Sequence, residues 1–189
     1  SYHTFAARIL YPYTIDSVMN PWPDRALYYA KRFAENAESF RTTRQYEVAR
    51  KLYPVDGTDQ DWYFFQFGSL AYIVEGSMDS PEYNSGIQSI LGIRPIWISA
   101  IREVLNGPRI EVYVLSKNGL PIRNATVQIL DEVTFQEERW TVHPETGRYD
   151  ILPGPFQEIT ILVKADGFQP NTRKLSCSKI CKEKFYLTQ

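Results

Sequence analysis

The chain has 189 residues, of which 43% are hydrophobic and 14% aromatic, so it can bury the cores of one or two domains. Its 21 basic and 22 acidic residues give a formal net charge of −1. This balance predicts no general attraction to nucleic acid or to an anionic membrane surface. No apolar run approaches the length that a bilayer span requires, and the first residues lack the layout of a signal peptide.

The first predicted helix begins after Asp24, whose side chain suits the N-cap position. Apolar residues then recur at helical spacing, and we expect the face that they form to be buried. These residues are Ala26, Tyr29, Ala30, Phe33, Ala37 and Phe40. Residues 46–53 predict a second, shorter helix, which Pro54 ends.

The next apolar run, residues 70–74, has the length and side chains of a buried strand, and Glu75 ends it. A carboxylate there is either a solvated strand end or a general base held on a rigid element. Residues 76–94 are polar and rich in Ser and Gly, which predicts a loop. Pro95 favours the first turn of another helix. Its predicted buried face consists of Trp97, Ala100, Ile101, Val104 and Leu105.

A glycine and a proline at positions 107 and 108 combine a helix C-cap with a chain breaker, which predicts a domain boundary after Gly107. Beyond it, short hydrophobic runs with a period of two are separated by turns, a pattern typical of a β-sandwich. The expected strands are residues 110–115, 126–130, 140–142, 149–152, 159–163 and 185–187.

The two cysteines, Cys177 and Cys181, allow two interpretations. They are either free thiols or a disulfide that closes a short loop in an exported protein. With no histidine nearby, they make a poor zinc site.

The stretch from Tyr53 to Glu75 resembles the C-terminal half of the catalytic domain of zinc metallocarboxypeptidases. In that family a tyrosine precedes an Asp-aromatic pair, and the catalytic glutamate ends the next strand. Here Tyr53 lies 8 residues before Asp61 (61 − 53) and Glu75 lies 14 after it (75 − 61), which matches the family's spacing. Gln60-Asp61-Trp62 is most similar to the regulatory (N/E-like) branch.

The resemblance implies an α/β fold followed by an all-β fold. Residues 1–107 would be the C-terminal half of a carboxypeptidase α/β/α mixed-sheet catalytic domain, and residues 108–189 a transthyretin-like β-sandwich. In that sandwich, Cys177 and Cys181 would bracket the loop of the last hairpin. Because the family is usually exported, the resemblance also implies a secreted, extracellular or periplasmic protein.

The resemblance implies catalytic roles for Glu75, as general base acting on zinc-bound water, and for Tyr53, which would close over the bound C-terminal residue. Gln60 would line the specificity pocket, and Tyr2 would line an outer subsite. Without the resemblance, Tyr53 is more simply interpreted as a helix-end tyrosine. The regulatory branch mostly removes C-terminal Lys or Arg from peptides or proteins.

The zinc ligands of the family fall on no residue of this chain, and the third of them would directly precede Ser1. We therefore expect zinc and activity to belong to a longer parent and the chain alone to be inactive. Its partners would be the missing N-terminal half of the catalytic domain or a second copy, because an incomplete sheet exposes apolar surface. The alternative is a non-catalytic β-sandwich interaction module attached to a degenerate peptidase domain.

Overall fold

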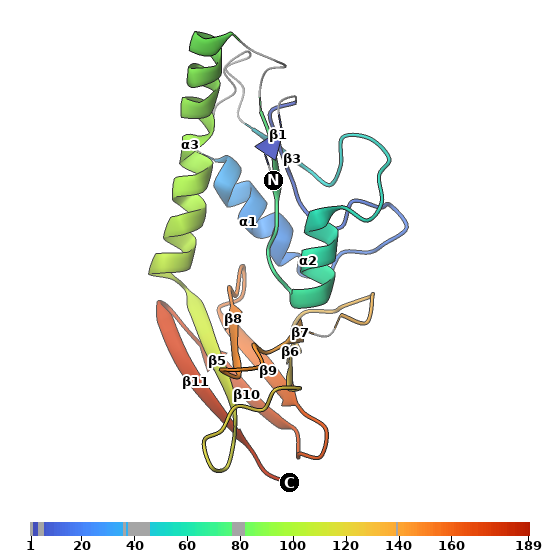
Figure 1. Cartoon of the computed structure of the whole chain (residues 1–189), viewed down its shortest axis with the longest axis vertical. Coiled ribbons are helices and arrows are strands. Elements are labelled where there is room, and N and C mark those ends of the chain that lie inside the picture. Colours follow the sequence, from blue (N-terminus) through green and yellow to red (C-terminus); the bar gives the residue numbers. More distant parts are fainter. Residues whose placement is uncertain (1, 4–5, 36, 38–45, 77–81, 139) are drawn as a thin grey trace. The chain divides into compact units, whose positions relative to one another are not determined.

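The computed structural model describes the chain except for residues 1, 4–5, 36, 38–45, 77–81 and 139, and it forms two compact units (Figure 1). Unit 1 comprises Ser1–Asn20, Asp24–Phe64 and Ser69–Arg102, and unit 2 comprises Pro21–Pro23, Phe65–Gly68 and Glu103–Gln189. Unit 1 combines helices with a mixed sheet, whereas unit 2 consists mainly of strands. The layout of α/β followed by all-β is therefore confirmed, while the division into residues 1–107 and 108–189 stays a prediction.

Unit 1 contains a four-stranded sheet in the order β1-β4-β2-β3, in which β4 is antiparallel to β2 and the other pairings are parallel. Its strands are β1 (Tyr2–His3), β2 (Arg8–Leu10), β3 (Glu47–Ala49) and β4 (Ile73–Glu75). The helices are α1 (Arg25–Ala34), α2 (Asp59–Phe67) and α3 (Tyr83–Asn106), and the last turns of α2 and α3 belong to unit 2. Ile9 and Val74, side by side on the two central strands, are buried.

Helix α1 begins where the sequence predicts. The Asp24 carboxylate accepts the Leu27 amide at 2.8 Å and the Asn20 side-chain amide at 2.8 Å. Burial raises the pKa of Asp24 above its ordinary value, although these hydrogen bonds lower it in part. The predicted buried face is confirmed for Ala26, Tyr29, Ala30, Phe33 and Ala37, while Phe40 lies outside the described residues.

Two segments around the sheet differ from prediction. Residues 46–53 form strand β3 and an irregular loop instead of a helix, because Val48 pairs with Ile9 at the edge of the sheet. Strand β4 starts at Ile73 and not at residue 70, yet Glu75 is still its last residue.

Helix α3 begins within the segment that was predicted to be a loop, and Pro95 lies inside the helix instead of in its first turn. Its buried residues are Ser89, Ile93 and Ile96. Four of the residues predicted to be buried are instead exposed: Trp97, Ile101, Val104 and Leu105. The prediction failed because both sides of α3 carry apolar residues at helical spacing. Within the described part of the chain, no helix combines the length and hydropathy needed to cross a membrane.

Unit 2 contains a four-stranded sheet in the order β10-β9-β6-β7 and a three-stranded sheet in the order β11-β5-β8, arranged as a β-sandwich (Figure 1). The strands are β5 (Arg109–Ser116), β6 (Thr126–Ile129), β7 (Trp140–Thr141), β8 (Arg148–Ile151), β9 (Glu158–Lys164), β10 (Asn171–Ser176) and β11 (Ile180–Leu187). Ile110, Val112 and Val114 of β5 are buried, in agreement with the period of two in the sequence. The polar strand β10 was not predicted.

Cys177 and Cys181 form a disulfide. The predicted last hairpin is wrong, because β10 pairs with β9 while β11 pairs in parallel with β5, so the disulfide loop joins the two sheets. The loop lies against the start of β5, where the Arg109 amide donates to the Lys179 carbonyl at 2.7 Å. Gly107, at φ +81°, allows this approach, since a Cβ there would lie 2.4 Å from the same oxygen.

Strand β5 also carries a buried acidic side chain, Glu111, which is only 4% exposed. Its carboxylate accepts hydrogen bonds from Arg109 at 2.6 Å and from the Tyr113 hydroxyl at 3.2 Å. Arg148 forms an ion pair with the same carboxylate at 3.3 Å. Burial raises the pKa of the Glu111 carboxyl, but these hydrogen bonds and positive charges lower it more, so its pKa lies below the ordinary value.

We predict that Glu111→Gln lowers the free energy of unfolding by about 1.5–3 kcal/mol at neutral pH, the usual contribution of hydrogen bonds to a charged group. Because the folded-state pKa is lowered, the stabilisation is fully present above the unfolded-state pKa and is lost as pH falls through the folded-state pKa. Urea unfolding should therefore show the two proteins converging in acid. The exposed Glu145→Gln serves as control. Equal stability of wild type and Glu111→Gln at neutral pH contradicts the prediction.

Residues 65–68 of unit 2 pack closely on the sandwich. Gly68 has φ +64°, and a Cβ there would lie 2.2 Å from the Tyr149 hydroxyl and 2.6 Å from the Trp140 ring. The Tyr149 hydroxyl donates to the Phe67 carbonyl at 3.1 Å, and the Tyr149 and Trp140 rings stack at 6.4 Å. This contact requires a glycine at position 68.

We predict that Gly68→Ala destabilises the protein by at least about 1 kcal/mol more than Gly57→Ala does. Both glycines have positive φ, but an added Cβ at Gly57 meets nothing within 4 Å, so the comparison isolates the steric clash. Thermal and urea unfolding of the two variants measures the difference. If Gly68→Ala and Gly57→Ala have the same free energy of unfolding, the close packing around Gly68 does not contribute to stability.

Candidate functional site

A small pocket in unit 1, about 70 Å³ in volume, brings together three of the four residues that the resemblance singles out: Tyr53, Gln60 and Glu75. They come from the loop after β3, from the first turn of α2 and from the end of β4. The full set of lining residues is Leu10, Thr14, Leu52, Tyr53, Val55, Thr58, Gln60, Ile73 and Glu75. Segments far apart in the sequence therefore converge on one cavity.

The backbone of a central strand fixes the position of Glu75. It pairs with His3 of β1 on one side and with Arg8 of β2 on the other. Its side chain is 8% exposed, and the preceding residue, Val74, is also buried. A carboxylate on a strand paired on both sides has little positional freedom, which suits a group that must meet a reacting atom.

Gln60 gives the pocket its most unusual feature, because its side chain is only 1% exposed. Neither the nitrogen nor the oxygen of its amide has a hydrogen-bond partner among the described residues, and the same holds for the Thr58 hydroxyl. A buried polar group without a partner costs about 1–3 kcal/mol. A polar ligand or water in the pocket would offset that cost, so this wall suits a binding site better than a packed core.

Tyr53 lines the pocket with a side chain that is 66% exposed. The alternative interpretation of Tyr53 as a helix-end tyrosine is wrong, because it lies in the irregular loop between β3 and α2. Tyr2 lies in β1, where it pairs with Val74. The side chain of Tyr2 lies outside the described part, so its predicted subsite role stays a prediction.

The segment before the pocket is held by buried hydrogen bonds. The Thr14 amide donates to the two carboxylate oxygens of Asp61 at 3.0 and 3.1 Å, and the Thr14 hydroxyl also donates to Asp61. Arg50 donates to the carbonyl oxygens of Ile15 and Val18 at 2.7 and 2.8 Å. These contacts give Asp61 a supporting role in the fold.

Thr14 and Thr58 are pocket residues that the sequence analysis missed. Both lie in irregular segments, where no periodicity shows which side chains point inward. The one available signal was proximity in sequence. Thr58 lies two residues before Gln60, and Thr14 directly follows a Tyr-Pro-Tyr triplet.

The described residues do not fit a catalytic zinc ion, since they contain no group of three or more His, Cys, Asp or Glu side chains that could hold a metal. What the fold and the pocket define is an α/β unit with a small, partly unsatisfied polar cavity, joined in sequence to a β-sandwich. In the comparisons with known proteins, neither a family model nor a curated protein matches the chain.

We predict that Asp61→Asn lowers the free energy of unfolding by about 1.5–3 kcal/mol, because it weakens charge-assisted hydrogen bonds to buried Thr14. Asp59→Asn is the matched control, since Asp59 is exposed on the same helix and should change stability little. Urea unfolding measures both variants. Equal effects of the two substitutions would contradict the supporting role of Asp61.

Proposed function

We propose that this chain is part of a zinc metallocarboxypeptidase of the regulatory branch, which removes C-terminal Lys or Arg from peptides or proteins. The observation that carries the proposal is the convergence of Glu75, Gln60 and Tyr53 on one pocket. The reaction class comes from the sequence resemblance, and the pocket supports it by holding the same three residues together.

Glu75 acts in this proposal as general base. Its carboxylate takes a proton from the water that attacks the peptide carbonyl and passes it to the leaving amine, a role typically worth about 10²–10⁴-fold in rate. Its buried position at the end of β4 supports this role. By the resemblance, the zinc ligands belong to the upstream part of the parent, and there the metal would polarise the peptide carbonyl and the attacking water.

Gln60 and Thr58 provide acceptors for a basic side chain in the same proposal. The Gln60 amide oxygen and the Thr58 hydroxyl are buried without partners among the described residues, and the N–H groups of Lys or Arg are donors. Tyr53 lies at the pocket with most of its side chain in solvent, which leaves it free to close over the bound residue.

The outer side of α3 supports the proposal that another polypeptide segment completes unit 1. Large apolar side chains are exposed along it: Tyr83, Ile87, Ile90, Leu91, Trp97, Ile98 and Ile101. Contiguous apolar patches of this kind mark interaction surfaces. We assign the surface to the N-terminal half of the catalytic domain, with self-association as the alternative when that half is absent.

The sandwich and its disulfide support the remaining parts of the proposal. We assign unit 2 to the transthyretin-like domain of the regulatory branch. The Cys177–Cys181 disulfide is compatible with an oxidising compartment, so we propose a secreted, extracellular or periplasmic protein.

The test uses a parent protein that includes the upstream segment, loaded with zinc, and peptides that end in Lys, Arg, Phe or Leu. We expect release of Lys or Arg, loss of release with a chelator, and a decrease of about 10²–10⁴-fold in kcat for Glu75→Gln. Glu82→Gln, at an exposed position of unit 1, should retain full activity. Circular dichroism should show that both variants are folded.

Two outcomes would overturn the proposal. Full activity of Glu75→Gln would show that Glu75 is not the general base. Absence of release from every peptide by the folded, zinc-loaded parent would favour the non-catalytic interaction module instead.

A further inference from the structure

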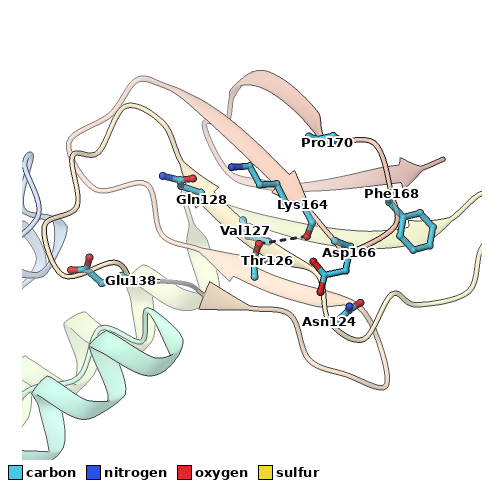
Figure 2. A pocket seen from close by; sticks show the side chains of 10 residues that line it. Asn124, Thr126, Val127, Gln128, Glu138, Lys164, Asp166, Phe168 and Pro170 are labelled. Carbon is cyan, nitrogen blue, oxygen red and sulfur yellow. Dashed lines mark hydrogen bonds between the residues drawn. The ribbon is translucent and has the colours of Figure 1, made fainter. Parts of the chain in front are cut away.

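A groove of about 490 Å³ lies on the outer face of the four-stranded sheet in unit 2 (Figure 2). Its floor is formed by Thr126 and Gln128 of β6 and by Lys164 of β9. These residues alternate along their strands with buried core residues, so the fold does not need them for its interior. The volume is within the range of small-molecule sites, about 300–1,000 Å³.

The lining combines hydrogen-bond donors and acceptors along the groove. Figure 2 shows the side chains of Lys164 and Gln128 to one side of Thr126, and those of Asp166 and Asn124 to the other. An ammonium group and two side-chain amides can donate, while the amides and the carboxylate can accept. A ligand whose groups can each both donate and accept hydrogen bonds would pair with the ammonium, the amides and the carboxylate at the same time.

Short hydrogen-bonded turns hold the walls of the groove. The Phe168 amide donates to the Ala165 carbonyl at 3.2 Å and the Gln169 amide donates to the Thr188 carbonyl at 2.7 Å. This fixes the loop that presents the half-buried Phe168 as an apolar surface at the groove. Glu138, which also lines the groove, accepts the Gln136 amide at 3.0 Å. The groove is therefore largely preformed.

Charge and topology argue against three other ligand classes. Two carboxylates, of Asp166 and the buried Glu138, line the groove beside the single ammonium of Lys164, which disfavours a phosphate or a nucleic acid. No described group of His, Cys, Asp or Glu can hold a metal ion. An extended peptide adds to an exposed sheet edge, but β6 and β9 are each paired on both sides. A neutral ligand rich in hydroxyl groups fits the mixture of donors and acceptors in the groove.

We propose that this groove binds a neutral oligosaccharide. Vicinal hydroxyls of the sugar pair with the amides of Asn124 and Gln128 and with the carboxylate of Asp166, while its C–H face packs on the Phe168 ring. The inference goes beyond the proposed peptidase function and does not depend on it, because every group belongs to unit 2.

The test is titration calorimetry with saturation-transfer NMR on the whole chain, using cellotetraose, chitotetraose, maltotetraose and mannotetraose as probes at millimolar concentration. We expect at least one probe to bind, and Asp166→Ala and Phe168→Ala each to weaken it about tenfold or more. Thr172→Ala should bind like the wild type, because Thr172 is exposed on strand β10 and does not line the groove.

The structural integrity of each variant is checked by circular dichroism. Asp166→Ala is the decisive variant, since its side chain is exposed and its loss should not affect folding. Absence of binding by all four probes overturns the proposal. So does binding that Asp166→Ala leaves unchanged, or binding of an acetylated hexapeptide without any sugar.

Discussion

The α/β unit buries two polar groups, the side-chain amide of Gln60 and the hydroxyl of Thr58, that have no hydrogen-bond partner among the described residues. Gln60 and Thr58 line the same pocket as Glu75, a carboxylate fixed between two neighbouring strands. A domain selected for stability alone would replace such groups with apolar ones, because each costs about 1–3 kcal/mol when unpaired. Such groups around a rigid acidic side chain favour a site that a polar ligand fills.

The two units bury their apolar surface to different degrees. Unit 2 places alternate residues of both sheets in one core, and its disulfide loop ties the start of β5 to the start of β11. Unit 1 has strands of only two or three residues and a long helix with an exposed apolar side. This difference supports the proposal that another polypeptide segment completes unit 1. It also explains why the two proposed activities can be tested separately.

The sequence predicted the elements that local chemistry determines. The Asp24 cap, the buried face of α1 and the end of β4 at Glu75 follow from capping chemistry, from period and from β-branched composition. The predictions were wrong where pairing with a strand distant in sequence determines the secondary structure or the strand order. Residues 47–49 became strand β3 because β2 offers an edge, and β11 pairs with β5 instead of with β10. Neither partner can be inferred from the local pattern.

The candidate site was predictable only in part, for a related reason. The family resemblance singled out Tyr53, Gln60 and Glu75, which do line one pocket. The threonines of the same wall lie in loops without periodicity, and a hydroxyl that lacks a partner is a property of the folded chain alone. Helix α3 shows the same limit, since two apolar faces leave its buried side undetermined until the sheet is placed.

The most direct test of the account is a crystal structure of the parent protein, with its upstream segment, bound to a product peptide that ends in Lys or Arg. The account predicts that the terminal side chain lies within hydrogen-bonding distance of the Gln60 amide, and that the Glu75 carboxylate faces the peptide carbonyl. A peptide bound elsewhere, with the Gln60 amide paired only to protein atoms, would contradict it.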